Sequence, residues 1–125
     1  VLQQLEVHVA QENAWNALRC SFSSLLGLSD MTGERQKRGV RVINEASSLR
    51  AHNLEKHLGW TDMLAPVIAT RLAGTDVDMR SRAIVQAGIA CFETALQAWS
   101  VAGEERTPDE LLVVAFDSLL GVVSS

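Results

Sequence analysis

Apolar residues recur every three or four positions along most of the chain, which is the spacing of an amphipathic α-helix. In the first segment this repeat predicts a helix over 1–28, with a weak point at 11–13 where polar residues interrupt it. A loop at 31–33 separates this helix from a shorter one over 34–46. The chain is therefore expected to open with two helices of unequal length.

A third helix is predicted to begin at Ser47 and to end at Gly74, with Leu54 and Ala65 on its apolar side. Pro66 lies within this segment. Because proline removes a backbone donor and crowds the preceding turn, we expect a kink at 62–66.

The last two predicted helices are apolar around most of their circumference. Over 77–101 the strongly polar side chains fall on one narrow stripe, which consists of Arg82, Gln86, Glu93, Gln97 and Ser100. The fifth helix begins at a capping box, in which Thr107 is the N-cap, Pro108 the first helical residue and Glu110 the reciprocal partner. No strand pattern interrupts these helices, so the chain is predicted to be one all-α domain of five helices over 1–125.

The fourth and fifth predicted helices have more apolar surface than the other three helices can shield from water. A second copy of the same pair across a twofold axis would provide that cover as an intermolecular four-helix bundle. We therefore predict a homodimer. The residues expected at its interface are Leu96, Trp99, Leu112, Phe116, Leu119 and Leu120. The alternatives are that both helices are deep core of a larger monomer, or that they face a part of the same chain that is missing here.

The charge and cysteine content exclude several classes of protein. The chain carries 11 basic and 15 acidic side chains, whereas domains that bind phosphates normally have an excess of Lys and Arg. Cys20 and Cys91 are too few for a disulfide framework or a zinc cluster, which favours the reducing cytoplasm. No apolar run reaches the length needed to cross a bilayer, so no membrane association is expected.

Patterns of catalysis and metal binding are missing from the sequence. It contains no nucleophile elbow, no phosphate-binding glycine loop and no His-Glu-x-x-His motif. His52 and His57 stand five positions apart, about 140° out of phase on a helix, and no cysteine or carboxylate completes a ligand set. We expect neither an enzyme nor a bound metal or cofactor.

One basic cluster begins the second predicted helix. It consists of Arg35, Lys37, Arg38 and Arg41. Such a run is most often a solvated helix face, but it could also contact a phosphate or a CoA-like tail. Both interpretations stay open on the sequence alone.

Several stretches of the chain resemble the C-terminal half of TetR-family regulators, in the subgroup associated with the mycofactocin regulator MftR. They are 71–74, 80–83, Ala95-Leu96-Gln97-Ala98-Trp99, Ala14-Trp15-Asn16-Ala17-Leu18-Arg19, 49–52, Trp60 and Leu64-Ala65-Pro66. The resemblance implies a two-part bacterial regulator, whose N-terminal helix-turn-helix reads an operator while this part binds a small molecule and dimerises. Residues 1–125 contain no helix-turn-helix, so we expect operator DNA to be contacted only through an N-terminal domain that lies outside this sequence.

The ligand pocket is expected between the first four helices. The candidate lining residues are Trp15, Phe22, Ile43, Leu54, Met63, Ile84, Gly88 and Cys91. Gly88 could leave space that a larger residue would fill. Ordinary core packing is the alternative for each residue, but as a set they favour a mostly apolar ligand.

The resemblance points to lipid-like or acyl-type effectors. Such a ligand would shift the population of subunit arrangements and thereby change the spacing of two DNA-reading heads. A freestanding helical module that binds another protein through the same apolar surface is the alternative function.

Overall fold

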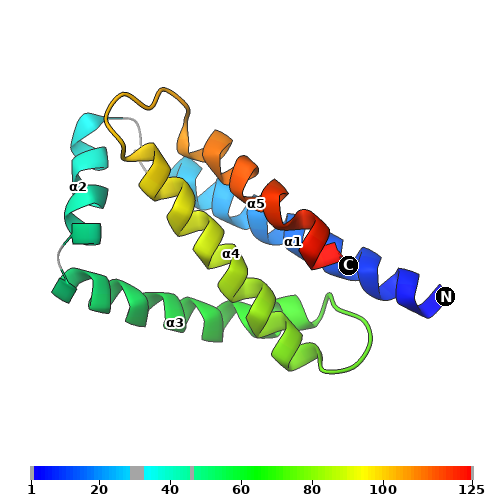
Figure 1. Ribbon diagram of the computed structural model, residues 1–125. Helices are drawn as coiled ribbons and strands as arrows, with labels where there is room; N and C mark the ends of the chain where they lie inside the picture. Colours follow the sequence, from blue (N-terminus) through cyan, green and yellow to red (C-terminus); the bar gives the residue numbers. More distant parts are fainter. Residues whose placement is uncertain (1, 29–32, 46, 125) are drawn as a thin grey trace.

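The computed structural model describes the backbone of residues 2–28, 33–45 and 47–124, and the side chains of 4–27, 33–43 and 54–123. Within these ranges the chain forms helices and no strand (Figure 1). The helices are α1 (Leu2–Leu28), α2 (Glu34–Glu45), α3 (Ser47–Ala69), α4 (Val77–Trp99) and α5 (Pro108–Ser124). The prediction of an all-α domain with five helices is confirmed. Most of the loop predicted at 31–33 lies outside the described residues.

Three of the helices run side by side, and α3 crosses α4 on its other side (Figure 1). α5 packs against both α1 and α4 and runs antiparallel to them, and in this view α1 lies behind the other two helices. The short helix α2 stands across the end of the bundle at which α4 finishes. The N-terminal turns of α1 project beyond the last turn of α5.

The core forms where α1, α4 and α5 meet. The rings of Trp15 and Phe116 lie 4.3 Å apart between centroids, and the Trp15 indole N–H donates to the Phe116 carbonyl oxygen at 3.1 Å. Both side chains are buried, as are Leu18 and Leu112 beside them. A side chain at Gly88 would collide with Leu18, so the glycine allows α1 to pack closely against α4.

α1 runs through 11–13 without a break, so the weak point predicted there is wrong. The Gln11 amide donates to the Val123 carbonyl at 2.5 Å and accepts from the Arg80 guanidinium at 2.6 Å. Arg80 also donates to the Ala73 carbonyl at 2.8 Å. These bonds join α1 to the end of α5 and to the loop before α4, and they replace the apolar contacts that the sequence lacks at this point.

α3 contains Pro66 and ends at Ala69, five residues before the predicted end. Just beyond this end, the Arg71 N–H donates to the Ile68 carbonyl at 2.9 Å and the Leu72 N–H donates to the Ala69 carbonyl at 3.2 Å. These bonds span three residues rather than four, so the chain is wound more tightly here. Gly74, at a φ of 97°, then turns the chain towards α4. The kink at 62–66 stays a prediction.

The capping box at the start of α5 forms as predicted. The Glu110 backbone N–H donates to the Thr107 hydroxyl at 3.1 Å, and the Thr107 N–H donates back to the Glu110 carboxylate at 3.4 Å. Two backbone donors at this helix end are thereby satisfied, and Pro108 has no N–H to satisfy. The start of α5 is therefore fixed by residues within one turn of each other.

Candidate functional site

Two adjoining hollows lie along the line where α3 packs on α4. The first, of about 140 Å³, also borders α2 and is lined by Val40, Ile43, Lys56, His57, Trp60, Phe92, Glu93, Leu96 and Gln97. The second, of about 280 Å³, is lined by Leu54, His57, Leu58, Thr61, Gln86, Ile89, Ala90 and Glu93. Because His57 and Glu93 line both, we treat the hollows as one feature, the α3–α4 cleft.

Aromatic rings form the inner wall of the α3–α4 cleft. Phe92 of α4 stacks on Phe22 of α1 with 4.8 Å between ring centroids, and Trp60 of α3 meets Phe92 edge-on at 6.2 Å. Such tilted and stacked pairs hold their rings in fixed orientations. The cleft therefore has a preformed apolar wall against which a ligand could pack.

A histidine and a carboxylate cross the middle of the cleft. His57 is 8% exposed, and its Nδ1 contacts Oε1 of Glu93 from the facing helix. The Thr61 hydroxyl donates to the His57 carbonyl at 3.1 Å, and the Trp60 ring lies 5.4 Å from the imidazole. This pair is the polar feature that could orient a ligand within an otherwise mostly apolar cleft.

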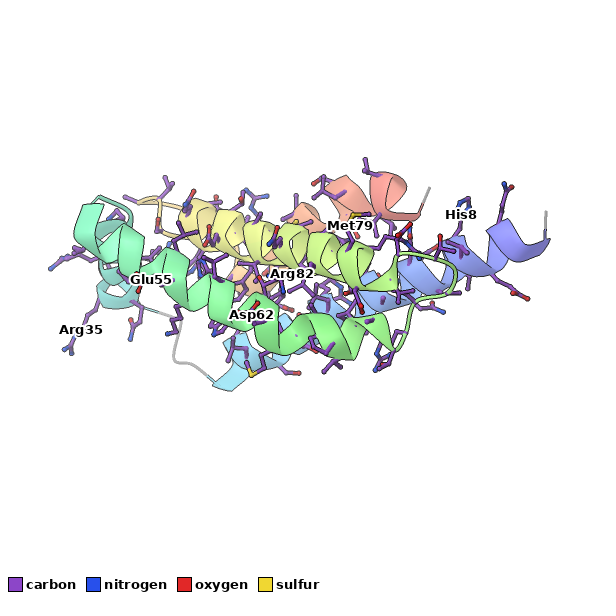
Figure 2. All side chains as sticks on the ribbon, turned by 90° about the horizontal axis from the view of Figure 1, so that it is seen from below. His8, Arg35, Glu55, Asp62, Met79 and Arg82 are labelled. Atoms are coloured by element: carbon purple, nitrogen blue, oxygen red, sulfur yellow. The ribbon has the colours of Figure 1, made fainter. Side chains whose placement is uncertain are left out.

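The sequence placed Glu93 on the polar stripe of α4, and that stripe turns out to face α3. Arg82, on the same stripe, donates to the Asp62 carboxylate of α3 at 2.9 Å, and the two side chains point towards each other in Figure 2. The contact between His57 and Glu93 was missed because the two residues are far apart in sequence. No group of three potential metal ligands occurs among the described side chains, and that of His52 lies outside them.

The structure divides the predicted pocket residues into three groups. Ile43 and Leu54 line the α3–α4 cleft. Trp15, Phe22, Ile84, Gly88 and Cys91 are buried in the core behind it, where Leu18 occupies the space beside Gly88. Met63 is 64% exposed on α3 and lines neither hollow. Apolar cleft residues that were not among the predicted pocket residues are Val40, Leu58, Trp60, Ile89, Phe92 and Leu96, of which Leu96 was expected at the dimer interface instead.

Cys91 behaves as a core residue. Its sulfur lies 3.6 Å from the Ala115 carbonyl oxygen, and burial raises the pKa of the thiol above its ordinary value. A raised pKa leaves less of the reactive thiolate at neutral pH. Cys91 is therefore suited to packing rather than to nucleophilic chemistry.

Half of the predicted interface residues are buried inside a single subunit. Trp99, Leu112 and Phe116 are each at most 3% exposed. With so little exposed surface these side chains cannot anchor a contact between subunits, so the three are corrected from interface to core. Leu96, Leu119 and Leu120 are partly buried against that core.

The outer flank of α4 carries small side chains. On its outer side, away from the cleft, they are Ala83, Ala87, Thr94 and Ala98, and Val101 follows just after the end of the helix. On α5, Val114, Ser118 and Gly121 are all exposed. We call these eight residues the small-residue face. It lies on the side of α4 away from α3.

None of the described helices is long and apolar enough to cross a membrane. The family model for the MftR C-terminal domain matches residues 12–124, which is most of the chain. The putative mycofactocin biosynthesis transcriptional regulator MftR of Mycobacterium tuberculosis is 24% identical to the chain over 102 residues. That alignment covers 82% of this chain and 51% of the relative, so the chain spans about half the length of that protein. No solved structure matches the chain.

Proposed function

Because this chain belongs to the family of MftR C-terminal domains of TetR-type regulators, we propose that it is the effector-sensing and dimerising part of a bacterial transcription regulator. The observation that carries the proposal is that α4 serves two surfaces at once. One side of α4 lines the α3–α4 cleft through Glu93, and another side carries the small-residue face. A ligand held in the cleft would therefore press on the same helix that meets a partner.

The small-residue face suits a second copy of the chain. Alanine and threonine allow two helices to approach closely, and the exposed valines at 101 and 114 add apolar surface to be covered. A twofold axis along α4 and α5 would place this face against itself in a four-helix bundle. The predicted homodimer is retained, with its contact moved from the buried anchors to this face and to the partly buried Leu119 and Leu120. Leu96 lines the α3–α4 cleft and is left out of the proposed contact.

The cleft suits a mostly apolar small molecule. Its lining is dominated by aliphatic and aromatic side chains, with Lys56, His57 and Glu93 as charged or titratable groups. An acyl-type effector could pack its chain on Phe92 and Trp60 while its polar end meets these groups. Binding would shift α4 against its partner and so change the spacing of the two DNA-reading domains of the full-length regulator, which would act in the cytoplasm.

Ile43→Asp tests the cleft as the effector site, with a fluorescent fatty acid as the probe. Ile43 lines the cleft from α2. A carboxylate at this position would lose its hydration when the apolar tail of the fatty acid binds beside it, and this loss disfavours binding. We expect at least about tenfold weaker binding of the probe, measured by fluorescence titration.

Val42→Asp is the matched control for this experiment. Val42 is the neighbouring residue on α2, is half exposed and does not line the cleft, so this variant should bind the probe like the parent protein. Equal losses in the two variants, or no binding by the parent protein, would argue against the cleft as the effector site.

A further inference from the structure

A separate hollow of about 580 Å³ lies where α1 ends, α2 begins and the 104–109 segment leads into α5. It is lined by Ser23, Leu26, Gly27, Lys37, Trp99, Glu104, Glu105, Arg106, Thr107, Pro108 and Asp109. None of these residues lines the α3–α4 cleft. We call this feature the corner hollow.

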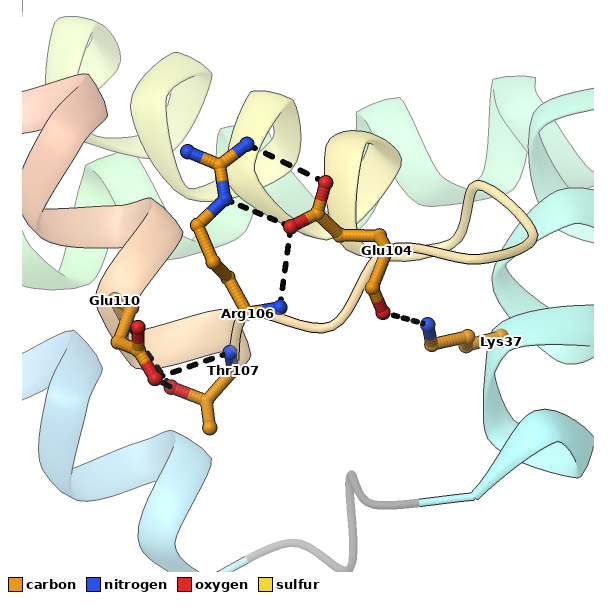
Figure 3. Close-up of polar contacts among 5 residues, drawn as sticks. All are labelled: Lys37, Glu104, Arg106, Thr107 and Glu110. Carbon is orange, nitrogen blue, oxygen red and sulfur yellow. Dashed lines mark hydrogen bonds and ion pairs between the residues drawn. The ribbon is translucent and has the colours of Figure 1, made fainter.

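A buried lysine forms one wall of the corner hollow. Lys37 is 8% exposed, and its Nζ donates to the Glu104 backbone carbonyl at 2.7 Å (Figure 3). The same nitrogen lies 5.6 Å from the centroid of the Trp99 ring. Within the described part of the chain Lys37 has no ion pair, although its ammonium carries three donors. A desolvated charge with spare donors is costly unless an anion pairs with it.

Most of the acidic side chains around the hollow are already engaged. The Glu104 carboxylate accepts from Nε of Arg106 at 2.7 Å, and this pairing lowers the pKa of Glu104 below its ordinary value. Asp109 accepts from the Ser23 hydroxyl at 2.5 Å and sits in the first turn of α5, where a negative charge is favoured. Glu105 is exposed to solvent. Lys37 is therefore the buried cation at this site that forms no direct ion pair within the described residues, although its charge helps to lower the pKa values of the Glu34 and Glu104 carboxylates.

The rest of the basic cluster does not share this role. Arg35 points away from the body of the molecule in Figure 2, and Arg38 is exposed. Arg41 contacts the Ser100 carbonyl oxygen and pairs with Glu34 at 3.0 Å, so it is already occupied. The cluster therefore consists of two solvated arginines, one arginine bound to the end of α4, and one lysine aimed at the hollow.

We propose that the corner hollow binds a small organic anion with a flat apolar body. The Lys37 ammonium receives the negative charge, and the apolar body packs against Leu26, Trp99 and Pro108. A site of this volume accommodates a molecule of one or two rings. The site is independent of the α3–α4 cleft, so the two can be occupied separately.

The three tryptophans of the chain provide the test. Trp99 lines the corner hollow, Trp60 lines the cleft and Trp15 lies in the core, so their indole N–H signals report on three places. The probe is 1-naphthoate, titrated into the ¹⁵N-labelled protein and followed by NMR. We expect the Trp99 signal to move while the Trp60 signal stays, and neutral 1-naphthamide to bind at least about tenfold more weakly.

Lys37→Met removes the charge and keeps the length of the side chain, and we expect the same tenfold loss of naphthoate binding. Arg35→Met, two residues away and exposed, is the control and should bind like the parent protein. A response of Trp60 in place of Trp99, equal binding of the amide, or unchanged binding by Lys37→Met would each overturn the proposal. Should Lys37→Met fail to fold, the comparison of naphthoate with naphthamide on the parent protein decides the matter.

Discussion

Replacing Phe116 with alanine should lower the free energy of unfolding by about 3–5 kcal/mol, the usual cost of removing a buried aromatic ring. Phe116 is 1% exposed and packs on Trp15 and Phe22 of α1, while its ring also approaches Gly88 of α4. The cavity left by the ring would border three helices that cannot all close around it. Small domains are stable by about 5–15 kcal/mol, so the loss is a large share of the total.

Val67→Ala is the matched control for Phe116→Ala. Val67 is 55% exposed on α3 and lies outside both the α3–α4 cleft and the small-residue face, and alanine has the higher helix propensity. Chemical denaturation of both variants should therefore show a large decrease for Phe116→Ala and a change within about 0.5 kcal/mol for Val67→Ala. Because the proposed dimer makes stability depend on concentration, both unfolding curves should be compared at one protein concentration. A small effect at Phe116 would show that the core is not centred where α1, α4 and α5 meet.

Thr94→Arg should weaken self-association by about a hundredfold or more, which corresponds to about 3 kcal/mol. Thr94 stands in the middle of the small-residue face, so twofold symmetry would bury two like charges in the dimer. The effect should appear as a higher dissociation constant in sedimentation equilibrium, with little change in the helical content.

Ser24→Arg is the control for this prediction, since Ser24 is exposed on α1 and lies outside the small-residue face. It introduces the same side chain on a helix surface that the proposed dimer leaves in water. Equal dissociation constants for Thr94→Arg and the parent protein would place the contact somewhere other than the small-residue face.

Local patterns in the sequence predicted the fold well. The capping box of Thr107 and Glu110 forms as expected, because both partners lie within one helical turn. The order and type of all five helices follow from apolar spacing and from breakers such as Gly74. The family resemblance, read from short helix-packing stretches, is confirmed by the match over residues 12–124.

Features that depend on contacts between helices were not predictable from the sequence. Gln11 looked like an interruption of α1 because its partners, Arg80 and Val123, are distant in the chain. No carboxylate was identified as a partner of His57 from the sequence, whereas in the structure Glu93 contacts it from the facing helix. Spacing along one helix cannot identify such partners, because it does not say which helix will lie opposite.

The dimer prediction illustrates the same limit. α4 and α5 are apolar around most of their surfaces, so their sequences could not tell which side faces the core. The largest side chains, such as Trp99 and Phe116, were assigned to the interface, but they are the ones that fill the subunit. The side that remains exposed is instead made of alanines and other small residues. Size alone therefore pointed to the wrong side of each helix.

Sedimentation velocity of the isolated domain at micromolar concentration is the most direct test of the central proposal that α4 meets a second copy. We expect a single species at twice the chain mass of 13.6 kDa. A single species at 13.6 kDa across the same concentrations would contradict it, because the small-residue face would then stay exposed to solvent.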